Sequence, residues 1–250
     1  MVEPVARSLR WPDCRNVRDL GGLPTSDGHR IRRGALIRAD NLDRLTPDGL
    51  AALHAAGVRR VIDLRTGRET RDYPHPLARH ASYLHAPLID EEQEKHRDPA
   101  SEPTLAEIYR GSIGRNARSI TAGLVAFADA PPGAVVVHCH AGKDRTGMYV
   151  ALALHAAGVA ARHIAEDYAY TAHCLRGQIE HDLDDLPDEQ TRARLRDLHG
   201  SEPGTILGML EHVDTRYGSV GNYLRGHGMS QRQYDTLRER LREPAEAVTS

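Results

Sequence analysis

Residues 134–155 read AVVVHCHAGKDRTGMYVALALH and carry the strongest structural signal in the chain. The valines after Ala134 predict a fully buried strand, and the apolar residues from Met148 onward predict a buried helix. The loop between them has a cysteine near its start, a glycine inside it and an arginine at its end. A strand that turns sharply into a helix directs backbone N–H groups, and the positive end of the helix dipole, at one point. This geometry favours an anion of phosphate size.

The side chains of the loop suit phosphoryl transfer. Cys139 would lie where a helix N-terminus and nearby cations stabilise the thiolate, which can attack phosphorus and form a covalent phospho-enzyme. Arg145 offers a planar fork of donors that fits two phosphate oxygens at once. Because phosphoryl transfer passes through a loose transition state, such positioning and charge supply most of the catalysis. Thr146 could donate its hydroxyl to the Cys139 sulfur and help it leave, and Gly142 lets the loop bend without a Cβ clash.

His138-Cys139, five further residues and then Arg145-Thr146 resemble the phosphate-binding loop of the protein tyrosine phosphatase superfamily. The AGKDR wording is similar to a bacterial branch that includes lid-bearing phosphatases acting on phosphotyrosine, phosphoserine or phosphothreonine, and phosphoinositides. The stretches 16–22, 42–65 and 217–224 also match that branch, so the resemblance covers about residues 16–241. It implies that His138 helps to orient the cysteine. The residues expected to hold phosphate are His140, Ala141, Gly142, Lys143, Asp144 and Arg145.

The general acid has two candidates. The resemblance suggests that Asp144 protonates the leaving oxygen, and a carboxyl beside a bound dianion favours the protonated state that an acid needs. Asp90, in an acidic segment after the third predicted strand, is the alternative, although a solvated charge run is the simpler interpretation. The tripeptide Trp11-Pro12-Asp13 spells the acid loop of eukaryotic tyrosine phosphatases, but it lies far before Cys139, so we interpret it as a coincidence.

Two further features, the Arg18-Asp19 pair and Lys143, are candidates for a supporting role at the loop. Arg18 and Asp19, in the NVRDLGG stretch, either brace the phosphate loop or form a local turn or salt bridge. The chain has 33 Lys plus Arg, yet only Lys95 and Lys143 are lysines. A lysine inside the loop is therefore a candidate second cation for the phosphate, or for a neighbouring phosphate on the substrate.

Other interpretations of Cys139 are weaker. A cysteine between His138 and His140 suits a metal ion, but no CxxC or His-x3-His pattern accompanies it. A buried, inert cysteine would leave the arginine, glycine and threonine unexplained. We therefore expect a cysteine-dependent phosphatase that needs no metal or cofactor. A non-catalytic phosphate-binding module is a remote alternative.

The substrate is less determined than the chemistry. A phosphotyrosine or dual-specificity protein phosphatase is the first expectation, with inorganic phosphate as product. A phosphatase of small metabolites or lipids, such as phosphoinositides, inositol phosphates or nucleotides, is the second. The net charge of −2 gives no sign of a nucleic-acid surface. The oligomeric state stays open.

Composition sets the remaining bounds. The 250 residues can bury a proper core. The three cysteines form no disulfide framework and suit a reducing compartment, although a redox role for Cys14 or Cys174 stays open. No apolar run is long enough for a signal peptide or a membrane span. We expect a cytoplasmic protein, while export without a signal peptide would leave no mark in the sequence.

The chain in order predicts an α/β fold, with a short parallel sheet of about four strands flanked by helices. The strands are expected at 35–39, 61–65, 82–88 and 134–138. Thr46 as N-cap, Pro47 at the first position and Gly57 at the end predict one helix. Further helices are expected at 105–128 with an interruption at 111–114, and at 161–175, 203–217 and 230–242. We expect one phosphatase domain over 1–250 with its core at 16–241, a surface helical hairpin at 183–198, a candidate lid at about 176–200 and a frayed tail at 244–250.

Overall fold

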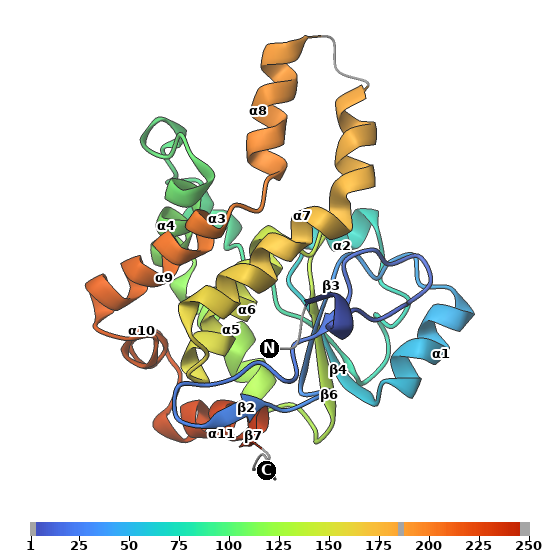
Figure 1. The fold of residues 1–250 in the computed structure, drawn as a ribbon, viewed down its shortest axis with the longest axis vertical. Coiled ribbons are helices and arrows are strands. Elements are labelled where there is room, and N and C mark those ends of the chain that lie inside the picture. Colours follow the sequence, from blue (N-terminus) through green and yellow to red (C-terminus); the bar gives the residue numbers. More distant parts are fainter. Residues whose placement is uncertain (1–3, 185–187, 246–250) are drawn as a thin grey trace, which may run out of the picture.

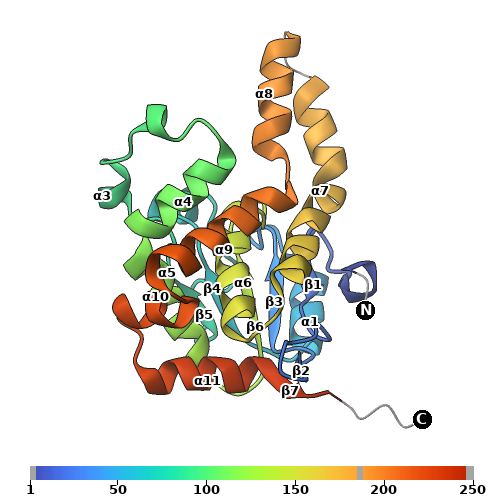
Figure 2. The same cartoon turned by 60° about the vertical axis from the view of Figure 1, so that its left-hand side comes forward.

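A five-stranded sheet lies at the centre of the protein (Figure 1), and its strands follow the order β1-β3-β6-β4-β5 (Figure 2). The computed structural model describes residues 4–184 and 188–245. Four strands run parallel, and the short β1 pairs antiparallel with β3 at one edge. The strands are β1 (Arg18–Asp19), β3 (Leu36–Ala39), β4 (Val58–Asp63), β5 (Tyr83–His85) and β6 (Ala134–His138). The parallel strands confirm the predicted α/β fold, to which β1 adds an edge that was not predicted.

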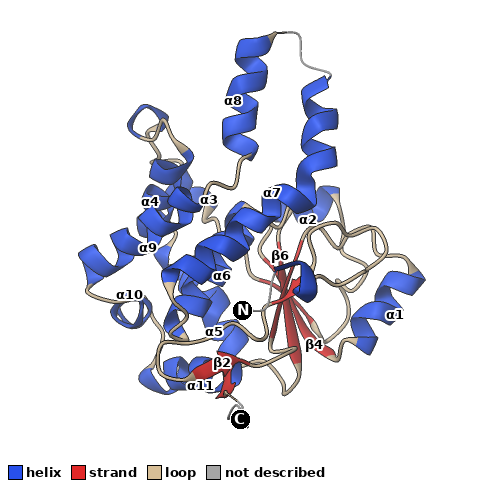
Figure 3. Ribbon diagram, viewed as in Figure 1, coloured by secondary structure: helices blue, strands red, loops and turns tan. Residues whose placement is uncertain are grey.

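Helices cover both faces of the sheet (Figure 3). They are α1 (Pro47–Ala55), α2 (Gly67–Asp72), α3 (Glu91–Glu94), α4 (Leu105–Arg115), α5 (Ala117–Ala128), α6 (Asp144–Ala156), α7 (Ala161–Asp184), α8 (Glu189–His199), α9 (Pro203–Tyr217), α10 (Val220–Gly226) and α11 (Gln231–Leu241). The described residues also form two 3-10 turns, η1 (Pro4–Arg7) and η2 (Pro99–Ser101), and a second sheet of β2 (His29–Ile31) with β7 (Arg242–Pro244).

The strands alternate their side chains between two apolar cores. Val135 and Val137 of β6 pack in the larger core with α5 and α6, whereas Val136 packs with Leu53 of α1 on the opposite face. All five residues of β6 are buried. Strand β6 has a parallel neighbour on each side, β3 and β4. The loop that follows β6 therefore lies between the C-terminal ends of these two strands.

Some boundaries differ from those predicted. The interruption between α4 and α5 falls at Asn116, not at residues 111–114, because the Asn116 side chain donates to Glu94 and Ser112 and accepts from the Asp90 N–H. The helix expected at 161–175 continues to Asp184. Pro244, expected in a frayed tail, belongs to β7. The tail residues 246–250 and residues 185–187 of the expected hairpin lie outside the described residues.

The C-terminal part of α7 and all of α8 project together from the body of the molecule (Figures 1 and 2). They correspond to the expected helical hairpin. Asp188 caps α8 by accepting from the Thr191 N–H, and Gly200 follows its last turn. The chain then enters α9 through Pro203 at the first helical turn.

Candidate active site

The loop at Cys139–Lys143 connects the end of β6 directly to α6. Helix α6 begins at Asp144, four residues earlier than the apolar pattern indicates, so Arg145 and Thr146 lie in its first turn. Among the described residues, no side chain caps the N-terminus of this helix. Its first N–H groups are therefore left for another acceptor, as in a helix N-terminus that binds an anion. Cys139 lies at the base of the loop and is only 2% exposed.

Carbonyl groups on three successive loop residues are held from outside the loop. Asn16 Nδ2 donates to the carbonyls of Ala141 and Gly142 at 3.0 and 3.2 Å, and Arg38 donates to Gly142 at 2.5 Å. The Asn41 N–H donates to the carbonyl of His140. Since a peptide N–H points opposite to its carbonyl, the amides that follow are directed to the inner side of the loop, which forms an anion-binding nest.

Gly142 is required by the same geometry. Its φ is +66°, and a Cβ there would lie 2.5 Å from the Ala39 carbonyl oxygen. A side chain would therefore combine left-handed backbone strain with a clash against β3.

Three buried arginines surround one carboxylate beneath the loop. Arg7, Arg18 and Arg38 all contact Asp167 of α7, at 3.2, 2.9 and 2.7 Å respectively. Burial opposes ionisation of Asp167, but the arginines outweigh it and hold its pKa well below the usual range. The guanidinium charges exceed the carboxylate charge, so the cluster leaves positive charge under the loop, where it favours an anion.

Arg145 is oriented by Glu69 of α2. The guanidinium donates from both terminal nitrogens to the two carboxylate oxygens, at 2.5 and 2.8 Å. Burial by itself raises the pKa of Glu69, but the hydrogen bonds from Arg145 and Thr66 lower it to about 2. This end-on pairing leaves the Nε edge of Arg145 for another bidentate acceptor. The local sequence around Arg145 does not indicate this pairing, because Glu69 lies 76 positions earlier.

Residues 9–243 match the profile of the tyrosine phosphatase family. The chain belongs to that family. It is therefore a cysteine-dependent phosphatase. A tyrosine-protein phosphatase of Nostoc commune is 32% identical to it over 87% of this chain and 78% of the relative. The triple specificity protein phosphatase PtpB of Mycobacterium tuberculosis is 28% identical over 91% of this chain and 96% of that protein.

Among solved structures, TpbA of P. aeruginosa aligns with this phosphatase at 16% sequence identity and a TM-score of 0.31. The alignment covers 73% of this chain and 90% of TpbA.

Lys143, the last residue of the loop, contacts the helical hairpin. Its ammonium group donates to the carbonyls of Leu198 and Gly200 at the C-terminal end of α8, and lies 3.3 Å from Asp144 Oδ1. The lysine is 4% exposed. In this structure the Lys143 ammonium group therefore binds the base of the hairpin. The sequence indicates a second cation for phosphate at this position but does not predict this contact.

His138, at the end of β6, and Thr146, in the first turn of α6, are fully buried. His138 Nδ1 lies 3.1 Å from the Cys139 carbonyl oxygen, and Nε2 lies 3.6 Å from Asp63. Burial lowers the pKa of His138, which favours a neutral ring that donates through Nδ1. The Thr146 hydroxyl has no hydrogen-bond partner within the described part of the chain, so the expected bond to the Cys139 sulfur is not formed here. His140, in contrast, is exposed.

The two N-terminal candidates, Arg18 and Asp19, have different partners. Arg18 supports the phosphatase loop indirectly, because it donates to Asn16 at 2.5 Å and to Asp167. The Asp19 carboxylate instead accepts from the N–H groups of Gly21 and Gly34, which agrees with the second alternative, a turn beside β1.

Asp90 and the Trp11-Pro12-Asp13 tripeptide belong to local structure elsewhere in the chain. The Asp90 carboxylate caps α3 by accepting from the N–H groups of Glu92 and Gln93. Trp11 is buried in the smaller core next to Val17, and Asp13 has a φ of +64° in the turn that follows.

The other two cysteines are free and chemically quiet. Burial, assisted by the nearby Asp40, raises the pKa of Cys14 to about 12, and burial likewise raises the pKa of Cys174. Both thiols therefore stay protonated and poorly nucleophilic at neutral pH.

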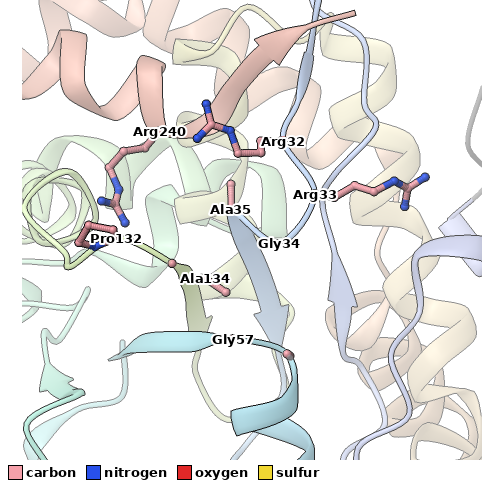
Figure 4. Close-up of a pocket in the computed structure, with 10 residues that line it drawn as sticks. Arg32, Arg33, Gly34, Ala35, Gly57, Pro132, Ala134 and Arg240 are labelled. Carbon is pink, nitrogen blue, oxygen red and sulfur yellow. The ribbon is translucent and has the colours of Figure 1, made fainter. Parts of the chain in front are cut away.

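Three further features concern the rest of residues 4–184 and 188–245. These residues contain no group of three or more His, Cys, Asp or Glu side chains placed to hold a metal ion. None of their helices has the length and apolarity that crossing a bilayer requires. A cavity of about 410 Å³, lined by Arg32 and Arg240, lies at the N-terminal ends of β3 and β6 (Figure 4). It lies at the opposite ends of the strands from Cys139, which follows the C-terminal end of β6.

Proposed function

We propose that the chain hydrolyses phosphotyrosine, or phosphotyrosine together with phosphoserine and phosphothreonine, through a cysteinyl-phosphate intermediate. The observation that carries this proposal is the loop itself. A buried cysteine, an uncapped helix N-terminus, outward-held carbonyls and an arginine fixed by Glu69 converge on one anion-sized position. Two relatives, a tyrosine-protein phosphatase and a triple specificity protein phosphatase, support the substrate class.

In the proposed first step, the Cys139 sulfur attacks phosphorus while the bond to the substrate oxygen breaks. Asp144 gives its proton to that oxygen, so the alcohol leaves neutral. Arg145 and the loop N–H groups hold the three phosphate oxygens and offset the charge that develops on them. His138 acts behind the nucleophile by fixing the Cys139 carbonyl.

In the second step, a water molecule attacks the phosphocysteine and gives a proton to the Asp144 carboxylate. Inorganic phosphate leaves, and Cys139 departs as a thiolate. The thiolate lies above the positive charge contributed by Arg38 and Arg18, whose geometry supports its departure. Asp90 is the weaker candidate for the acid because its carboxylate is already engaged as a helix cap.

We further propose one domain over residues 1–250, in which the hairpin at about 176–200 acts as a lid. The bonds from Lys143 to the end of α8 support this, because they connect the hairpin base to the loop. A cytoplasmic location is proposed as well, since all three cysteines are free.

Phosphate release without added metal tests the proposal. We expect wild-type protein to release phosphate from phosphotyrosine peptides, and Cys139→Ser to abolish release while the variant still binds phosphate. Phosphoserine peptides, phosphoinositides and nucleoside monophosphates complete the panel, so that a better lipid or nucleotide substrate would replace the proposed class. Binding of phosphate with no release from any substrate would contradict hydrolysis and favour a binding module.

A further inference from the structure

The two oxygens of the Asp144 carboxylate have different surroundings. Oδ1 accepts a hydrogen bond from the Tyr109 hydroxyl at 2.8 Å and lies 3.3 Å from Lys143 Nζ. No hydrogen-bond donor from residues 4–184 or 188–245 reaches Oδ2, and the side chain is 42% exposed. One oxygen is therefore tied to the protein on its buried side, and the other is open to a bound substrate.

The hydroxyl that holds Oδ1 is itself held. Tyr109 of α4 and Tyr168 of α7 are each 1% exposed, and their hydroxyl oxygens lie 2.9 Å apart. Their rings meet edge to face with centroids 6.1 Å apart. A buried hydroxyl needs a partner. Because Asp144 accepts at the end of this chain, the direction that satisfies both hydroxyls runs from Tyr168 to Tyr109 to Asp144.

The first turn of α6 is shaped to accept this pair. A Cβ on Gly147 would lie 3.0 Å from the ring of Tyr168, closer than most real Cβ contacts. Gly147 has ordinary helical backbone, so the close approach of Tyr168 from α7 explains why this position is a glycine. The same approach places the Tyr168 hydroxyl next to that of Tyr109.

We propose that Tyr109, supported by Tyr168, is a positioning residue for the acid–base chemistry of Asp144. This inference rests on the proposed function, in which Asp144 is the general acid. With Oδ1 already accepting from Tyr109 and facing the Lys143 ammonium group, the acidic proton resides on Oδ2. That is the oxygen open to the substrate.

Both proposed steps then use the same oxygen. In the first, the proton on Oδ2 moves to the leaving oxygen and the carboxylate keeps its donors at Oδ1. In the second, the attacking water returns a proton to Oδ2 as its oxygen bonds to phosphorus and the S–P bond breaks. Tyr109 donates throughout and exchanges no proton.

A series of aryl phosphates tests this role through Tyr109→Phe. We expect kcat/KM, which reports formation of the phosphocysteine, to fall roughly tenfold for phosphotyrosine, whose leaving group needs a proton. For p-nitrophenyl phosphate, whose leaving group does not, kcat/KM should fall less than about twofold. Any slowing of phosphocysteine hydrolysis lowers kcat equally for both substrates, and inhibition by vanadate should not change, because phosphate binding is unaffected. Tyr168→Phe should give the same pattern with a smaller loss.

The matched control is Tyr149→Phe. Tyr149 is also fully buried, and its hydroxyl donates to the Gly123 carbonyl at 2.9 Å, away from Asp144. It should lose stability without any dependence on the leaving group. If Tyr109→Phe does not fold, the Tyr109→Phe/Tyr168→Phe double variant removes both hydroxyls and leaves neither unpaired, and the same leaving-group dependence is expected of it.

Asp144→Asn separates the possible failures. A leaving-group dependence in Asp144→Asn, together with equal losses on both substrates in Tyr109→Phe, would overturn the positioning role and keep the proposed acid. Equal losses on both substrates in Asp144→Asn would overturn the acid and this inference with it. Absence of phosphate release by the wild type would overturn the proposed function itself.

Discussion

Glu69 positions Arg145 through charge and shape together. Its carboxylate takes both terminal nitrogens of the guanidinium, and charge-assisted hydrogen bonds of this kind contribute about 1.5–3 kcal/mol. We expect Glu69→Ala to lower kcat/KM by roughly ten- to a hundredfold, because Arg145 loses the partner that orients its fork. Glu69→Gln keeps one acceptor and should lose less. Steady-state kinetics on p-nitrophenyl phosphate measures both.

Glu69 has two roles, capping of α2 and orientation of Arg145, and a second variant distinguishes them. Glu69 also closes the capping box of α2 with Thr66. Thr66→Ala removes the cap and should cost about 1 kcal/mol in the free energy of unfolding, with kcat/KM nearly unchanged. If Thr66→Ala lowered kcat/KM as much as Glu69→Ala, the arginine would owe its orientation to the intact helix and not to the carboxylate.

At the scale of elements, the junction of β6 and α6 depends on Gly142. We expect Gly142→Ala to destabilise the fold by about 1–2 kcal/mol or more, because left-handed backbone is unfavourable for alanine and the new Cβ meets β3. Phosphate and vanadate affinity should fall with it, since the loop amides move. Urea unfolding and vanadate inhibition provide the two measurements.

Gly114→Ala is the matched control for that change. Gly114 lies in α4 with open space around its Cβ position. The substitution should stabilise the protein by about 0.5–1 kcal/mol, since alanine restricts the unfolded chain and favours the helix. A loss of stability at Gly114, or none at Gly142, would contradict this account of the loop.

At the scale of the whole molecule, acid should lower the free energy of unfolding over two successive pH ranges. His75 is buried, and burial lowers its pKa to about 3, so its ring is neutral in the folded state. The unfolded chain binds that proton below about pH 6.5. Stability therefore falls with pH in this window, by about 2 kcal/mol from His75 between pH 7 and 5. Asp167 and Glu69, whose pKa values are lowered, contribute their loss only below about pH 5.

Urea midpoints at pH 7, 6 and 5 measure the loss over the first range. In His75→Asn the asparagine oxygen can accept from the Leu77 N–H, as His75 Nδ1 does now. The fall between pH 7 and 5 should become shallower in this variant, while the exposed His54→Asn should behave as wild type. An unchanged slope in His75→Asn would show that other groups take up the protons.

Local patterns predicted what lies inside one short stretch. The valines of β6, the glycine at 142 and the arginine at 145 are all readable because strand, turn and anion chemistry each depend on near neighbours in sequence. The side chains that hold them are not readable in this way. Glu69 lies 76 positions from Arg145, Tyr109 lies 35 from Asp144, and Asp167 lies 129 from Arg38. These pairs follow from how helices pack on the sheet, which one sequence does not specify position by position.

The pairing of β2 with β7 has a consequence for biosynthesis. Arg30 and Glu243 bond across 213 positions, and the register joins residues 29–31 to 242–244. During translation, β2 emerges from the ribosome early, but this sheet closes only after residues 242–244 have been made. Ribosomes add about 5–20 residues per second, so the early segment waits on the order of ten seconds or more for its partner. The parallel sheet can assemble during that interval, which makes the β2–β7 pairing a closing step of co-translational folding.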